Sequence, residues 1–181
     1  MHRLPALAAF ALLLAPVGAW ADVADSSASG FTVKVALNIQ ATPEEVYAKI
    51  VRNIGDWWNS AHTFSGNAHN LTIEEKPMGC FCEKLPNGGG VRHMEVVNLA
   101  PGKTLVMIGG LGPLQSMGVT GSMTITVTPV PTGGTKVTVT YAVAGYMPAG
   151  MNTLAAPVDG VLTQQFTRLK NYAEHGRPDL P

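Results

Sequence analysis

The chain has 181 residues, of which 46% carry apolar side chains and 13% are charged, and its formal net charge is zero. This length is typical of one folded domain and excludes a large multidomain enzyme. A neutral chain also lacks the broad basic surface that attracts nucleic acid, so no nucleic-acid partner is expected. Charged residues make up about 25% of an average globular chain, so their scarcity here needs an explanation.

The first 21 residues have the three parts of a secretory signal peptide. Arg3 supplies positive charge, residues 4–15 are apolar, and Ala19-Trp20-Ala21 places small residues where a signal peptidase cleaves. A membrane-spanning helix needs about 20 apolar residues, so neither this run nor any later stretch predicts an integral membrane span. We therefore expect a signal peptide over residues 1–21, a flexible lead-in over residues 22–30, and a periplasmic or secreted protein.

Apolar and polar residues then alternate from Phe31 to Gln40, which predicts a strand with one buried face. The segment Thr42-Pro43-Glu44-Glu45 has the features of a helix start, because it offers an N-cap, a proline at the first position and a capping box. Gly55 is expected to end this helix. A second short helix or turn is expected from Asp56 to about His62.

Six further strands are predicted, separated by turns that are too short for parallel crossovers. They cover residues 71–76, 79–84, 91–99, 103–109, 119–130 and 135–146. From Leu154 the apolar spacing becomes helical and continues to near Gly176, and Pro157 indicates a late start or a kink. The predicted fold is α+β: a seven-stranded antiparallel sheet curled around a long C-terminal helix, with two short helices between strands 1 and 2.

This order of elements resembles the START/Bet v 1-like (SRPBCC) superfamily, in its bacterial polyketide-cyclase and Hsp90-ATPase-activator-like branch. The resemblance is carried also by T-P-E-E-V-Y-A-K-I at residues 42–50, the Trp57-Trp58 pair, and A-P-G-K-T-L-V-M at residues 100–107. It covers residues 31–174, and a domain of this kind is assigned to residues 31–176, before a tail of residues 177–181.

The resemblance implies a helix-grip fold with a large, mostly apolar cavity between the sheet and the C-terminal helix. In many members of the superfamily this cavity holds a lipid, sterol, polyketide or hormone-like molecule. The resemblance implies no shared catalytic signature, and no cofactor is expected.

Thioether and aromatic side chains are candidates for the wall of such a cavity, because they suit irregular apolar pockets. The Gly-rich loop over residues 109–118 carries large apolar side chains, which predicts either a lid over the cavity or an ordinary packed loop. It is not a phosphate-binding loop, because no Lys-Ser/Thr follows its glycines. The expected ligand-binding residues are Trp57, Trp58, Phe64, Met107, Leu111, Met117, Met123 and Tyr141.

A polar group of residues occurs at Cys80, Cys82, His93 and Glu95. If the predicted strands at residues 79–84 and 91–99 pair so that the numbers of facing residues sum to 175, all four side chains lie on one face of the sheet. Cysteines two apart in a regular strand have Cα atoms about 6.5 Å apart, which predicts two free, buried thiols, or a bridge if the backbone bulges. A zinc site would depend on that register and lacks the usual ligand spacings, so no metal is assigned.

His93 is the candidate general acid or base, with Glu95 or Glu75 as its partner, because imidazole titrates near neutrality. These side chains are equally compatible with the outer surface of the sheet. No nucleophile turn of the G-x-S-x-G type occurs.

The sequence therefore favours an exported helix-grip protein that binds a hydrophobic small molecule without transforming it. A cyclase- or hydrolase-like enzyme acting on a hydrophobic substrate is the alternative. A cochaperone-like interaction module fits less well, because export would separate it from cytosolic Hsp90. A chain that lines a cavity as well as filling a core needs few charged residues, so the composition also favours a pocket.

Overall fold

The alternating segment of the sequence forms the strand β2 (Gly30–Ile39) in the computed structural model, which describes residues 20–180. Its five large apolar side chains are buried, and the long C-terminal helix packs against this strand. These side chains are Phe31, Val33, Val35, Leu37 and Ile39. The period-two pattern therefore predicted both the strand and its buried face.

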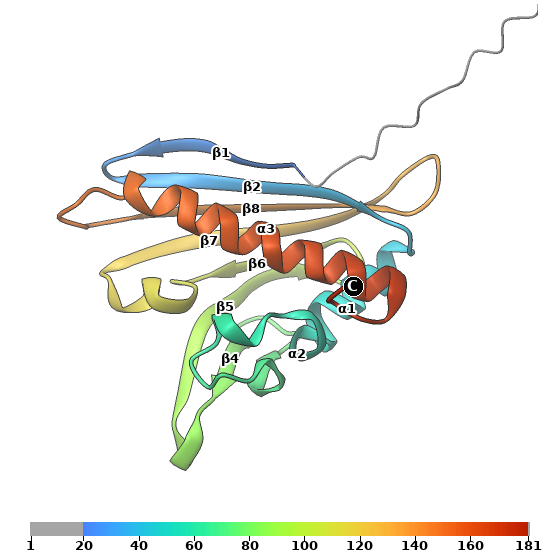
Figure 1. Ribbon diagram of the computed structural model, residues 1–181, viewed down its shortest axis with the longest axis horizontal. Coiled ribbons are helices and arrows are strands. Elements are labelled where there is room, and N and C mark those ends of the chain that lie inside the picture. The colour runs from blue at the N-terminus through green and yellow to red at the C-terminus, as the bar shows by residue number, and fades with distance from the viewer. Residues whose placement is uncertain (1–19, 181) are drawn as a thin grey trace, which may run out of the picture.

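The strands form one antiparallel sheet in the order β1-β2-β8-β7-β6-β5-β4-β3 (Figure 1). The other strands are β1 (Trp20–Ser27), β3 (Leu71–Ile73), β4 (Cys80–Lys84), β5 (Gly90–Ala100), β6 (Thr104–Ile108), β7 (Val119–Pro129) and β8 (Thr135–Gly145). The six strands predicted after residue 70 are confirmed. Their ends differ from the prediction by one residue at most, except that β3 ends at Ile73.

Within residues 20–180 the sheet has eight strands where seven were predicted, because β1 occupies most of the expected flexible lead-in over residues 22–30. β1 pairs with β2 across a hairpin that brings Ser27 opposite Gly30. An edge strand is held by backbone hydrogen bonds and needs few buried side chains, so a segment rich in Asp and Ser gave no strand pattern. The predicted signal peptide lies mostly outside the described residues.

The α-helices of residues 20–180 are α1 (Pro43–Arg52), α2 (Ile54–Trp57) and α3 (Asn152–His175). α1 begins as predicted. The Glu45 N–H donates to the Thr42 hydroxyl, and the Thr42 N–H donates to the Glu45 carboxylate at 3.0 Å, which completes the capping box. None of these helices is both long and apolar enough to cross a membrane.

Gly55 lies inside α2 and does not end the preceding helix, so that prediction was wrong. A Cβ atom at Gly55 would lie 2.9 Å from the Cα of His69. The glycine therefore allows α2 to contact the 3₁₀ helix η2 (Ala68–Asn70). The short helix predicted from Asp56 to His62 is divided between α2 and the 3₁₀ helix η1 (Ser60–His62).

α3 lies across one face of the sheet (Figure 1) and ends where Gly176 adopts a left-handed conformation, with φ at 73°. Pro157 lies within the helix, which begins at Asn152, earlier than predicted. The C-terminal half of α3 packs into the core through Phe166 and Leu169, which are fully buried. Its N-terminal half lines a cavity.

Gly121 in β7 makes room for a buried tyrosine beside that cavity. A Cβ atom at Gly121 would lie 2.6 Å from Cε2 of Tyr141 and 2.7 Å from the carbonyl oxygen of Ala142. Tyr141 is fully buried and cannot move aside. We therefore expect Gly121→Ala to lower the free energy of unfolding by about 1 to 3 kcal/mol, measured by urea unfolding. The control is Ser122→Ala, an exposed position on the same strand; equal losses in the two variants would contradict the steric explanation.

Candidate ligand-binding cavity

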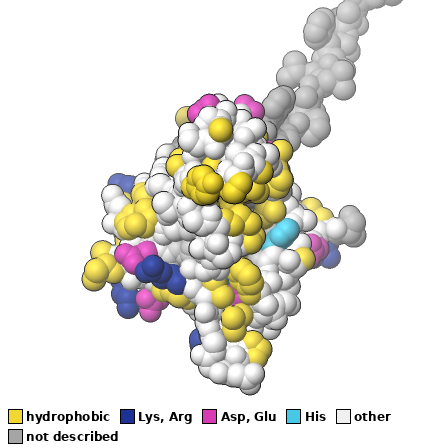
Figure 2. All heavy atoms as spheres, turned by 90° about the vertical axis from the view of Figure 1, so that its left-hand side faces the viewer, with side chains coloured by type: hydrophobic (Ala, Val, Ile, Leu, Met, Phe, Trp, Pro, Cys, Tyr) yellow, Lys and Arg dark blue, Asp and Glu magenta, His cyan; other side chains and the backbone are white. Residues whose placement is uncertain are grey.

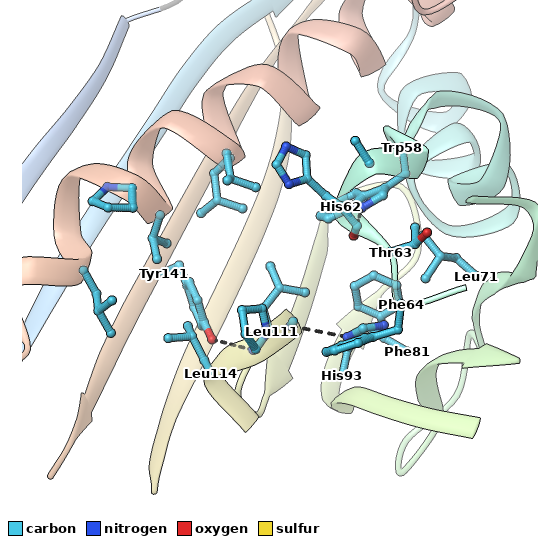
Figure 3. A pocket seen from close by; sticks show the side chains of 18 of the residues that line it. Trp58, His62, Thr63, Phe64, Leu71, Phe81, His93, Leu111, Leu114 and Tyr141 are labelled. Atoms are coloured by element: carbon cyan, nitrogen blue, oxygen red, sulfur yellow. Dashed lines mark hydrogen bonds between the residues drawn. The ribbon is translucent and has the colours of Figure 1, made fainter. Parts of the chain in front are cut away.

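A cavity of about 380 Å³ lies beneath the N-terminal half of α3 (Figure 3). Its wall is formed by α3, by the segment that follows α2, by side chains of the sheet, and by the Gly-rich loop that contains the 3₁₀ helix η4 (Gly112–Ser116). Nearly all of the lining side chains are apolar; the polar ones come from His62, Thr63, His93 and Tyr141.

One wall of the cavity is aromatic. The ring of His93 lies 5.2 Å from that of Phe81 and is stacked on that of Phe64 at 6.0 Å, centroid to centroid. Trp58 meets Phe81 edge to face at 6.0 Å. Figure 3 shows these rings gathered on one side of the cavity, and Tyr141, Leu111 and Leu114 on the other.

The opposite wall is aliphatic. It consists of Leu154, Val158, Val161 and Leu162 from α3 together with Leu111, Leu114 and Met117 from the Gly-rich loop. The end of the molecule that holds this loop and the start of α3 is seen in Figure 2, where hydrophobic side chains gather across the middle and most charged side chains lie towards the margins. A ligand in the cavity would lie between an aromatic and an aliphatic surface.

Five of the predicted ligand-binding residues line the cavity: Trp58, Phe64, Leu111, Met117 and Tyr141. The other three, Trp57, Met107 and Met123, are buried in the core away from it. Met107 and Met123 face each other across β6 and β7, and the Trp57 indole N–H donates to the carbonyl oxygen of Lys49. Alternation correctly turned Met107 and Met123 inward, but it cannot distinguish an inward residue that meets the core from one that meets a cavity.

Tyr141 anchors the beginning of the Gly-rich loop. Its hydroxyl donates to the carbonyl oxygen of Gly109 at 2.9 Å and accepts from the N–H of Leu111 at 3.0 Å. Burial raises the pKa of Tyr141 to about 12, so the hydroxyl keeps its proton at neutral pH. The loop is thereby held with its apolar side chains against the cavity.

A buried pair of polar side chains, His93 and Glu83, lies at the aromatic wall. His93 Nε2 is 3.1 Å from Glu83 Oε2, and the two side chains are 4% and 0% exposed. The N–H of Gly112 donates to His93 Nδ1 at 3.3 Å, so Nδ1 carries a lone pair and Nε2 carries the proton that it donates to Glu83. Both ring nitrogens of His93 are therefore occupied by protein partners.

The protonation of this pair follows from its surroundings. Burial lowers the pKa of His93, and the hydrogen bond and charge of Glu83 oppose that shift without reversing it. Burial acts to raise the pKa of Glu83, but hydrogen bonds from Ser65, Phe64 and His93 outweigh it and lower the pKa. At neutral pH the pair is thus a neutral imidazole and an ionised carboxylate.

Sequence reasoning missed Glu83, although it connects two walls of the cavity. Its carboxylate accepts the N–H of Phe64 at 3.1 Å and the N–H of Ser65, and through His93 it reaches Gly112 in the Gly-rich loop. A signal was present, because residues two apart in a strand share a face. An inward Phe81 therefore requires an inward Glu83.

A bulge in β5 turns His93 towards the cavity. β4 and β5 have the predicted register where Cys80 faces Glu95 and Phe81 faces Met94, but the next pair is Cys82 with Arg92. His93 is the extra residue, and both it and Met94 are buried. A bulge of this kind adds one residue to a strand and shifts the alternation beyond it.

The bulge corrects two predictions. The four polar residues do not share a face, because Cys80, Cys82 and Glu95 alternate with buried neighbours and lie on the outer side of the sheet. Glu95 accepts a hydrogen bond from Arg92 at 2.8 Å, and the other predicted partner of His93, Glu75, pairs with Arg52 at 3.1 Å. The partner of His93 is Glu83 instead.

Cys80 and Cys82 form a disulfide, which confirms the alternative that depended on a bulged backbone over that of free thiols. Their Cα atoms are 5.2 Å apart, closer than the roughly 6.5 Å of a regular strand, and the pairing of β4 with β5 shifts register between Phe81 and Cys82. The two sulfur atoms are therefore not free to bind a metal.

The sheet, the long helix and the cavity between them define a helix-grip protein. The chain belongs to the family of polyketide cyclases, dehydrases and lipid transport proteins, whose sequence profile matches residues 30–174. This result confirms the resemblance found in the sequence. A search of curated proteins found no match.

Several solved structures share the fold. A conserved protein of unknown function from Enterococcus faecalis is 14% identical, with a TM-score of 0.59 over 90% of this chain and 80% of its own. A protein from Rhizobium leguminosarum is 15% identical, with a TM-score of 0.59 over 86% and 97%. DynU16, a protein of the dynemicin biosynthetic locus, is 18% identical, with a TM-score of 0.57 over 81% of this chain and 48% of DynU16. At these identities the likeness concerns the fold alone.

The buried state of His93 predicts a pH dependence of stability. Its pKa is lower in the folded protein than its ordinary value of 6.5, so unfolding takes up a proton as the pH falls through that value. We expect the free energy of unfolding to be smaller at about pH 5.5 than at about pH 7.5. Glu83 adds to this loss only at lower pH, because its folded pKa lies below its ordinary value of 4.5.

Urea unfolding at the two pH values tests this expectation, with His93→Gln as the variant and His69→Gln, at an exposed histidine, as its control. The decrease in stability on acidification should shrink in His93→Gln and persist in His69→Gln. If acidification lowered the free energy of unfolding equally in the wild type and in both variants, His93 would not be the cause of the pH dependence.

Removing the disulfide tests its role in holding the bulge. We expect the double variant Cys80→Ser and Cys82→Ser to lose about 1 to 2 kcal/mol of unfolding free energy, because the closed loop is short. Amide hydrogen exchange at Phe81 and Met94, which face each other beside the bulge, should become faster. The wild-type protein reduced with dithiothreitol should match the variant, and unchanged exchange in both would show that the disulfide does not stabilise this part of the sheet.

Proposed function

We propose that this protein is an exported carrier that binds a hydrophobic small molecule in the cavity without transforming it. The observation that carries the proposal is a mostly apolar cavity of about 380 Å³ in which His93 and Tyr141 already have protein partners. Small-molecule sites usually combine an apolar lining with a few polar groups and measure about 300 to 1,000 Å³. This cavity is near the lower end of that range, which suits one compact ligand.

The hydrogen bonds of His93 favour binding over catalysis. A general base must come within about 2.6 to 3.2 Å of the proton that it removes. His93 Nδ1 is covered by the N–H of Gly112, and Nε2 by Glu83. The other candidate, Glu95, is on the outer side of the sheet with Arg92. A cyclase- or hydrolase-like activity with His93 as the general base would require Gly112 to move away from Nδ1.

The proposal of export rests on two independent features. The first is the basic, apolar and small-residue pattern of residues 1–21. The second is the Cys80–Cys82 disulfide, because disulfides persist in oxidising compartments such as the periplasm and are rare in the cytosol. A carrier in such a compartment would hold its apolar cargo away from water.

Filling the cavity tests the binding function. Val158 on α3 lines the cavity, so we expect Val158→Trp to occupy ligand space and to weaken binding of the neutral fluorescent probe N-phenyl-1-naphthylamine by about tenfold or more. The matched control is Ala156→Trp, two residues earlier on the same helix, which is exposed and does not line the cavity. An unchanged dissociation constant in Val158→Trp would contradict binding at this site.

Native mass spectrometry of the purified protein provides a second test of the same function. A carrier is expected to retain molecules from the host, and the retained mass should be absent from Val158→Trp and present in Ala156→Trp. Loss of the retained mass from both variants would indicate that the effect is not specific to the cavity.

A further inference from the structure

We infer that the cavity selects uncharged ligands and excludes anionic ones of the same shape. The inference rests on the proposed binding function and adds the charge class of the ligand. Within residues 20–180, no lysine or arginine lines the cavity. Arg92, the neighbour of His93 in sequence, is 66% exposed in its side chain and pairs with Glu95 outside the sheet.

Glu83 does not itself line the cavity, but its carboxylate is bonded to two residues that do, His93 and Phe64. It is completely buried and hydrogen-bonded to His93 Nε2 and to the N–H of Phe64. His93 does not neutralise it, because the imidazole is itself uncharged. A negative charge therefore lies one hydrogen bond behind the lining of the cavity.

Backbone N–H groups, which can bind anions without a cation, are also occupied around the cavity. The N–H groups of Phe64 and Ser65 donate to Glu83, that of Gly112 donates to His93, and that of Leu111 donates to Tyr141. An anion that entered between residues 64–65 and the Gly-rich loop would have to break one of these hydrogen bonds before a backbone N–H could donate to it.

These features act against an anionic ligand in two ways. A carboxylate or sulfonate that leaves water for an apolar cavity loses its hydration and meets no lysine or arginine in the lining. It also approaches the charge of Glu83 through a medium of low dielectric, where repulsion is stronger than in water. A neutral molecule of the same shape meets neither cost. Selection by a repulsive element of this kind is a common source of specificity.

A pair of probes isolates the charge. N-phenyl-1-naphthylamine and 1-anilinonaphthalene-8-sulfonate share one ring system, and the second differs by a single sulfonate. We expect the sulfonate to bind the wild-type cavity at least about tenfold more weakly, with binding measured by fluorescence titration and by mutual displacement. Displacement restricts the comparison to one site, because the sulfonate also binds exposed apolar surface.

The outcomes are distinct. Equal or tighter binding of the sulfonate at the site shared with the neutral probe contradicts the charge selection and leaves the binding function intact. Failure of both probes to bind contradicts the binding function and, with it, the selection. Binding of the neutral probe alone supports both.

Adding a cation provides the reverse test. Pro157 lines the cavity from an exposed position on α3, and replacing a proline inside a helix does not weaken the helix. We expect Pro157→Lys to shift the ratio of the two dissociation constants by about tenfold in favour of the sulfonate. Ala156→Lys, the matched control outside the cavity, should leave the ratio at its wild-type value. A ratio that does not move in Pro157→Lys, or that moves equally in both variants, overturns the inference.

Discussion

The carboxylate of Glu83 holds together parts of the chain that are distant in sequence. It accepts hydrogen bonds from the backbone of Phe64 and Ser65 and from the ring of His93, which in turn accepts the N–H of Gly112. A buried ionised carboxylate is tolerated only when its oxygen atoms are paired, and here each oxygen has a partner. The aromatic wall and the Gly-rich loop are therefore positioned by one network, and the polar groups of that network are unavailable to a ligand.

Most of the fold could be predicted because its signals are local. The alternation in β2, the capping box of α1 and the helical spacing of α3 are properties of adjacent residues, and each was confirmed. The site depended on a bulge between β4 and β5, which is a property of two paired strands. A shift of one residue exchanges inward for outward side chains, so the partner of His93 could not be predicted without that register.

The low content of charged residues has two origins in the structure. Apolar side chains line the cavity as well as filling the core, as the composition indicated. The outer face of the sheet is the second origin, because β7 and β8 pair threonine with threonine there, as at Thr124–Thr140 and Thr126–Thr138. Short uncharged side chains occupy positions where many sheets carry Lys or Glu. The composition alone therefore overstated the case for a pocket.

In the proposed mode of binding, the cavity holds an apolar molecule while His93 keeps both of its protein partners. A crystal structure of the protein with a neutral hydrophobic ligand tests it most directly. We expect density between Phe64 and Val158, with Gly112 N–H still bonded to His93 Nδ1 and Glu83 still bonded to Nε2. Density at another site, or a ligand oxygen on Nδ1 in place of Gly112, would contradict it.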